Sequence, residues 1–227
     1  MPHPLSRDIG QVELEREVAL ASRLYKQAIA DLYPSYSDQL EVKCTAAAPV
    51  LAAYLRQTKG VDAHMVAGLY IHLSPRVSWQ YDEDIAMRAE SAARHYFTGD
   101  GESVFRRHYM IQKDGERKDR QHLIDQTHEF VLIKRRGGDF FFVDLTYRQF
   151  GNATFQGDFI VDVVDAKKLL FTYGLVILSP DTQKGMRQVE TKIERGRFSI
   201  DLYKEDTKAN MILTRMLQLR KDENAGA

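Results

Sequence analysis

The sequence contains a single cysteine, Cys44, among its 227 residues. No internal disulfide can therefore form, and a cysteine-based zinc site would need further thiolates. The apolar runs are all shorter than the roughly 18 residues that a membrane-spanning helix needs. The N-terminal segment also lacks the apolar region of a secretory signal peptide. We therefore expect a cytoplasmic protein without a membrane partner, or one that is exported without a cleaved signal.

Charge of one sign is not in excess, because 32 Lys and Arg residues balance 32 Asp and Glu residues. A dedicated nucleic-acid-binding domain usually has a strong basic excess, so nucleic acid is not an expected partner. Repeats, low-complexity segments and Pro- or Gly-rich linkers are also missing. The chain is therefore expected to form one domain over residues 1–227, with a core at about 39–180 and a helical extension at about 181–227.

Apolar spacing predicts helices and a strand in the first part of the chain. Residues 11–33 have the 3.6-residue periodicity of an amphipathic helix, and Pro34 is expected to end it and begin a loop. A small-residue helix should begin at Cys44 and end at Lys59-Gly60, where glycine is the expected C-cap. A strand at 63–73 and a helix at 82–97 are predicted next.

Two apolar runs, residues 128–136 and 140–150, surround Gly137-Gly138-Asp139 and predict a β-hairpin. The two glycines supply the positive φ angles that a tight hairpin turn requires. Further apolar spacing predicts strands at 174–179 and 197–203 and a helix at about 205–221. The order of helices, then strands, then a helix indicates an α+β fold rather than a doubly wound parallel sheet.

Cys44 is the first candidate for chemistry because it opens a predicted helix, at a helix start that we expect to be exposed. Partial positive charge at a helix N-terminus favours the thiolate over the thiol. A thiolate with a base beside it can act as a nucleophile. The alternative is a buried structural cysteine, since free cysteines are among the most buried residues.

His128 and Asp144 lie on opposite sides of the predicted hairpin turn. With the turn centred near residue 137, antiparallel pairing puts His128 opposite about residue 146, so Asp144 is close to a diagonal neighbour. Such a carboxylate would accept a hydrogen bond from one imidazole nitrogen and direct the other toward a thiol. The alternative is an edge histidine and a strand-end aspartate that caps a turn.

These residues together resemble the papain-like and transglutaminase-like superfamily of cysteine enzymes. The resemblance consists of the run Cys44-Thr-Ala-Ala-Ala, the helix, glycine and strand that follow it, and the chain order Cys44, His128, Asp144. Asp144-Leu145-Thr146 with Gln149-Phe150 resembles a variant seen in some bacterial members. The long interval between Cys44 and His128 is similar to that of bacterial effector protein-glutamine deamidases. The resemblance spans about residues 39–150 and implies a nucleophile helix packed on an antiparallel sheet, with additional helices.

The resemblance also implies a thiol hydrolase acting on an amide of a protein substrate, without a metal or cofactor. Cys44 would be the nucleophile, His128 the base and Asp144 the residue that orients it. Gln39 and the Cys44 backbone N–H would hold the oxyanion, although Gln39 in a surface loop is an equal alternative. Gln149 would lie near the site. Glu129 departs from the family, in which an aromatic residue often follows the histidine.

Deamidation of a glutamine side chain is the reaction that this resemblance favours. A cysteine protease, or a transglutaminase or other acyltransferase of the same fold, is the alternative reaction. A non-catalytic protein-binding module is a second alternative, of a different class. The sequence does not indicate an oligomeric state.

Other polar features have ordinary interpretations. His64 and His72 share one face of the strand predicted at 63–73, but no carboxylate cluster accompanies them, so no metal site is expected. The basic segment 106–120 is either a solvated face or a docking surface for an acidic partner. Met211 and Met216 in the last helix indicate core packing or a partner groove.

Overall fold

The structure, a computed structural model, describes residues 7–37, 44–70, 127–135, 139–150, 157–177 and 204–226. Several predicted segments lie outside these residues, among them the helix at 82–97, the charged region 98–120, the Gly137-Gly138 turn and the strand at 197–203. The chain divides into two compact units. The first unit comprises Met1–Met65, Phe130–Val163 and Arg187–Ala227, and the second comprises Val66–Glu129 and Val164–Met186.

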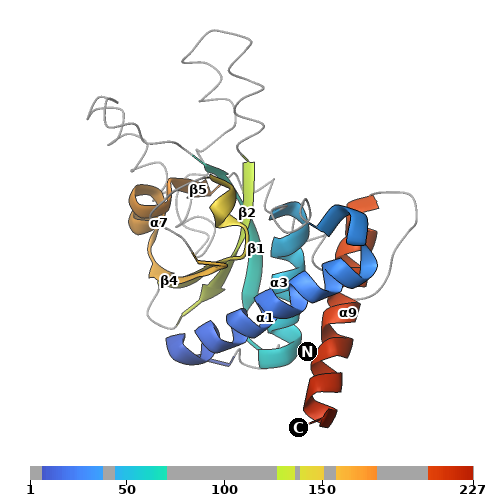
Figure 1. The fold of residues 1–227 in the computed structure, drawn as a ribbon. Coiled ribbons are helices and arrows are strands. Elements are labelled where there is room, and N and C mark those ends of the chain that lie inside the picture. The colour runs from blue at the N-terminus through green and yellow to red at the C-terminus, as the bar shows by residue number, and fades with distance from the viewer. Residues whose placement is uncertain are drawn as a thin grey trace, which may run out of the picture. The chain divides into compact units, whose positions relative to one another are not determined.

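Three helices of the first unit contact one another, although they come from opposite ends of the chain (Figure 1). These helices are α1 (Gln11–Leu32), α3 (Cys44–Lys59) and α9 (Lys204–Gly226). Helix α9 contacts both α1 and α3, so the C-terminal part of the chain completes a helical layer begun by the N-terminal part. All three helices were predicted from the sequence and are confirmed, although α9 continues to Gly226, beyond the predicted end at about Lys221.

Helix α1 buries one apolar face and is bounded by backbone hydrogen bonds. Its first turn is closed by a hydrogen bond from Leu14 N–H to the Gly10 carbonyl, at 2.9 Å. Its last turn is closed by a hydrogen bond from Tyr33 N–H to the Ile29 carbonyl, at 2.7 Å. Pro34 then begins a short 3-10 helix, η1 (Pro34–Tyr36), where a loop had been expected. Proline fits this first position because its missing N–H would have no intrahelical partner there. The buried side chains of α1 include Leu14, Val18, Ala21, Leu24, Tyr25, Ala28 and Ile29.

Helix α3 is buried on every side through its middle, from Ala46 to Leu55. A helix that is apolar all round needs neighbours all round, and small alanines let those neighbours approach closely. Gly60 ends the helix as predicted, with φ of +65° and an N–H bonded to the Arg56 carbonyl at 3.0 Å. This left-handed conformation favours glycine because it has no Cβ.

Helix α9 faces the layer with Ala209, Ile212, Leu213 and Met216, all of which are buried. The expectation that Met211 belongs to this face was wrong, because its side chain is 45% exposed. Met211 lies beside this buried stripe rather than in it, and its sulfur accepts a hydrogen bond from Tyr33 Oη at 3.6 Å. Core packing is thus the role of Met216 but not of Met211.

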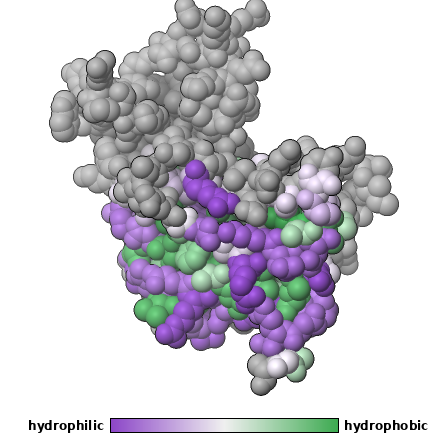
Figure 2. Space-filling model, in the orientation of Figure 1, coloured by the Kyte–Doolittle hydropathy of each residue, from purple (hydrophilic) through white to green (hydrophobic). Residues whose placement is uncertain are grey.

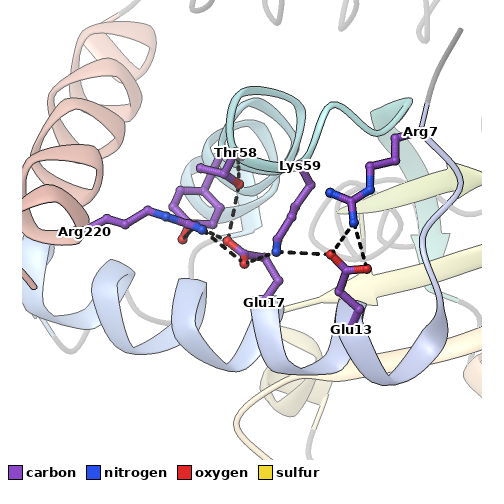
Figure 3. Close-up of polar contacts among 7 residues, drawn as sticks. Arg7, Glu13, Glu17, Thr58, Lys59 and Arg220 are labelled. Carbon is purple, nitrogen blue, oxygen red and sulfur yellow. Dashed lines mark hydrogen bonds and ion pairs between the residues drawn. The ribbon is translucent and has the colours of Figure 1, made fainter. Parts of the chain in front are cut away.

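A buried carboxylate, Glu17, joins the three helices (Figure 3). Its side chain on α1 is 5% exposed and contacts Arg220 of α9 and Lys59 of α3. The Lys59 Nζ to Glu17 Oε2 distance is 3.0 Å, and Thr58 Oγ1 donates to Glu17 Oε1 at 3.3 Å. Arg220 also donates to the Tyr54 hydroxyl. We call Glu17, Tyr54, Thr58, Lys59 and Arg220 the Glu17 cluster.

Burial raises the pKa of Glu17, but hydrogen bonds from Arg220 and Lys59 lower it more, so the net pKa is below the usual value. Burial likewise raises the pKa of Tyr54, and the nearby Glu17 carboxylate raises it further. Glu17 is therefore ionised and Tyr54 protonated at neutral pH. A carboxylate without cationic partners would be costly at this depth.

The strands are hydrogen-bonded in the order β4-β3-β2-β1-β5. They are β1 (Ala63–Tyr70), β2 (Thr127–Lys134), β3 (Phe140–Asp144), β4 (Ile160–Val164) and β5 (Leu175–Ile177). The β1–β5 and β2–β3 pairings are antiparallel. Helices with an antiparallel sheet agree with the predicted α+β class.

The predicted hairpin is formed by β2 and β3, with Val131 opposite Val143 and Lys134 opposite Phe140. This register is centred at residue 137, as predicted from the glycine pair. Every residue of β3 is buried, which agrees with the apolar run Phe140–Val143 that precedes Asp144. The expected length of this strand was wrong, because β3 ends at Asp144 and residues Tyr147–Phe150 form a 3-10 helix, η2.

In the second unit, α7 (Ala166–Tyr173) contacts β5. The strand predicted at 174–179 is confirmed as β5, and the preceding Gly174 has φ of +65°, as expected for a helix C-cap. Apolar spacing had not indicated β4 or α7. Both are short, and β4 is mostly half-buried, so neither has a long periodic pattern.

Candidate functional site

Cys44 is the first residue of α3, as the sequence predicted. The expectation of an exposed helix start was wrong, because Cys44 is buried, with 8% of its surface exposed. The helix continues into a wholly buried stretch of alanines, so its first turn lies near the protein interior. The thiol thus has the position of a helix N-terminus together with the burial of a packed side chain.

Asp144 is the last residue of β3 and is 2% exposed. Its Oδ1 accepts two hydrogen bonds from Thr146, from the backbone N–H at 2.7 Å and from Oγ1 at 3.0 Å. The backbone bond is that of an Asx turn, in which an aspartate at a strand end folds the chain away from the strand. The interpretation of Asp144 as a turn cap is therefore correct, whether or not it also has a catalytic role.

His128 is the second residue of β2 and is fully buried. Strand β2 lies between β3 and β1 in the strand order. The alternative of an edge histidine was therefore wrong. Cys44 and Asp144 belong to the first unit and His128 to the second, one residue before the boundary that crosses β2.

The face of the hairpin that carries Phe130 and Phe142 has direct side-chain contacts between the strands. These two rings meet edge to face, with centroids 5.3 Å apart and planes at 75°. Phe142 also meets Tyr147 of η2 in the same geometry, at 6.4 Å. Since Phe142 is opposite Leu132 in the register, Phe130 and Phe142 are diagonal neighbours. This one diagonal pair is thus in contact.

The other predicted site residues have less to add. Gln39 lies outside the described residues, so its predicted role as oxyanion donor stays a prediction. Gln149 lies in η2, and its role near the site likewise stays a prediction. His64 lies beside Asp62, with its Nε2 2.7 Å from Asp62 Oδ1, and a hydrogen bond from His64 is the main cause of the lowered pKa of Asp62. His72 lies outside the described residues.

Sequence reasoning missed Thr146 as a partner of Asp144. The side chain is 1% exposed and provides a second donor to the same carboxylate oxygen. The signal was present, because a threonine two residues after an aspartate is the usual spacing of an Asx turn. The sequence was interpreted there as a continuing strand, in which Thr146 would share a face with Asp144 but lack the turn that brings the two into hydrogen-bond contact.

Within the part of the chain that the structure describes, no group of three or more His, Cys, Asp or Glu side chains could hold a metal ion. No described helix is both long and apolar enough to cross a membrane. Figure 2 shows hydrophilic residues over much of the described surface on one face, with smaller apolar areas between them.

The chain matches no family model, no curated protein and no solved structure.

Proposed function

We propose that the protein is a thiol hydrolase that acts on an amide through Cys44, His128 and Asp144. One observation carries this proposal, the register of the hairpin. Val131 pairs with Val143, and the diagonal neighbours Phe130 and Phe142 are in contact. Extended beyond Val131 and Val143, where the pairing ends, this register would give His128 and Asp144 the same offset on the same face, two residues farther from the turn on each strand. That Asp144 orients His128 is the part of the proposal that the Asp144→Asn variant tests.

The proposed reaction uses each residue in one role. Cys44 sulfur attacks the amide carbonyl carbon and forms a C–S bond, while His128 accepts the thiol proton. His128 then gives this proton to the leaving nitrogen as the C–N bond breaks, which leaves a thioester. Water attacks the thioester after losing a proton to His128, and the C–S bond breaks to regenerate the thiol. Asp144 holds the imidazole in the tautomer and orientation that these transfers need.

A glutamine side chain of a protein is the amide that we favour, on the resemblance of the chain to effector glutamine deamidases. Its leaving group is ammonia and its product a glutamate. Proteolysis and transamidation would use the same thioester with a different leaving group or acceptor. Assays for ammonia, for peptide cleavage and for amine incorporation therefore separate the three reactions.

The test combines thiol labelling with turnover. Iodoacetamide should alkylate Cys44 of the native protein at mildly acidic pH, and His128→Gln should slow this reaction. Because His128 is fully buried, the unfolding midpoint of this variant is measured alongside its alkylation. Ammonia release from a blocked glutamine dipeptide should disappear in Cys44→Ser and His128→Gln. His64→Gln is the matched control, because it removes a histidine that pairs with Asp62 outside the proposed site. Asp144→Asn should reduce turnover by roughly 10²–10⁴-fold, the range of an orienting carboxylate.

The burial of Cys44 supports a second candidate, a non-catalytic protein-binding module. In that case Cys44 is a packing residue and Asp144 only a turn cap. Alkylation would then be slow at mildly acidic pH and equal in the His128→Gln and His64→Gln variants. That result would refute the hydrolase proposal.

A further inference from the structure

The inference concerns Thr146 and rests on the proposed function. Asp144 Oδ1 accepts from both the backbone N–H and the hydroxyl of Thr146, at 2.7 and 3.0 Å. Both residues are buried, at 2% and 1% exposure, so neither bond competes with bulk water. Both also belong to the first unit.

Two donors on a single carboxylate oxygen restrict how that carboxylate can rotate. The Asx turn itself requires only the backbone N–H. The hydroxyl donates a second hydrogen bond to Oδ1 from another direction, and the two bonds together restrict the plane of the carboxylate as well as the position of Oδ1. An ionised carboxylate has lone pairs on both oxygens, so Oδ2 can accept from an imidazole while Oδ1 is held.

We propose that Thr146 is a positioning residue, whose hydroxyl holds the Asp144 carboxylate in the single orientation that its proposed orienting role requires. The side chain acts through Asp144 and does not contact the reacting atoms. A valine at this position would preserve the branched shape and the backbone N–H but remove the hydroxyl donor. A serine would keep the hydroxyl and lose only the methyl group.

The experiment compares Thr146→Val with Thr146→Ser in the full-length protein. Three quantities are measured: the pH profile of iodoacetamide alkylation of Cys44, kcat and KM for ammonia release from the blocked glutamine dipeptide, and the urea unfolding midpoint. Thr146→Val should move the alkylation profile to higher pH and lower kcat by about 10-fold with KM little changed, because only one of the two donors is lost. Thr146→Ser should retain the wild-type profile. Thr146→Ala removes the same hydroxyl with a smaller side chain and replaces the valine variant if that variant does not fold.

Two outcomes would overturn the inference, and they differ. If alkylation and turnover in wild type depend on His128 and Asp144 but Thr146→Val only lowers the unfolding midpoint, Thr146 has a turn role alone and the proposed function stands. If His128→Gln changes neither alkylation nor turnover, the proposed function fails and the inference about Thr146 fails with it.

Discussion

Replacement of Glu17 by glutamine tests whether the buried cluster joins the three helices. Glutamine keeps the shape of the side chain but removes the negative charge that pairs with both Arg220 and Lys59. Loss of one partner from a buried ion pair typically costs about 3–5 kcal/mol, because the other charge stays buried. Here the Arg220 and Lys59 side chains are 23% and 18% exposed, so both can partly reach water. We therefore expect a loss of about 2–3 kcal/mol in the free energy of unfolding, roughly two thirds of the fully buried case.

Glu13→Gln is the matched control, since Glu13 lies one turn earlier on α1 and also contacts Lys59, at 3.3 Å. Its side chain is 38% exposed, and its other partner, Arg7, is 57% exposed. Exposed pairs contribute about 0–1 kcal/mol, so the control should lose no more than that. The two variants thus differ mainly in burial, with similar chemistry and a shared lysine.

Urea denaturation monitored by circular dichroism and by fluorescence measures both variants. Coincident transitions would support a two-state analysis, in which the midpoint shift at constant slope gives the stability change. For a chain of this length, Glu17→Gln should lower Tm by about 5–10 °C. Equal losses in Glu17→Gln and Glu13→Gln, within about 0.5 kcal/mol, would refute the argument from burial.

Three further predictions follow from the same structure. Burial raises the pKa of Glu17, but hydrogen bonds from Arg220 and Lys59 outweigh this effect and lower the pKa in the folded protein. The contribution of Glu17 to stability should therefore be complete above pH 4.5 and be lost as pH falls through the folded pKa. The urea midpoints of wild type and Glu17→Gln should accordingly converge in acid. Gly60→Ala should destabilise the protein by about 1–2 kcal/mol, because φ of Gly60 is +65°. Gly10→Ala is its control: the space around the added Cβ is equally open, but φ is −76°, so the unfolding midpoint should change much less. Phe142→Ala should cost about 3–5 kcal/mol in urea unfolding, since its buried ring contacts two other aromatic rings; a loss below about 1 kcal/mol would show that the hairpin face is not closely packed.

Local chemistry was sufficient to predict much of the fold from the sequence. Helices α1 and α9 were predicted from long apolar periodicities, and α3 was predicted from its run of small helix-forming residues; none of these signals depends on distant residues. Gly60 and Pro34 mark helix ends through their own backbone preferences. The hairpin register was predicted because a turn fixes which residues pair across it. The short elements β4 and α7 lacked enough periods to be recognised, and η2 was interpreted as strand because its residues continue an apolar run.

The candidate site, too, could be predicted from the sequence only in part. Cys44, His128 and Asp144 could be named from residue type, order and the predicted register, but their burial could not. Burial of Cys44 depends on how α3 is enclosed, which its own sequence does not encode. Thr146 became visible as a partner of Asp144 only once the end of β3 was known.

The Glu17 cluster depends on the tertiary structure alone and could not be predicted from the sequence. On its own helix Glu17 is one of several charged residues and carries no mark of burial. Its main partner, Arg220, is separated from it by 203 residues of chain. No local pattern can relate residues at that distance, because their pairing depends on α9 packing against both α1 and α3, and that packing exists only in the folded layer.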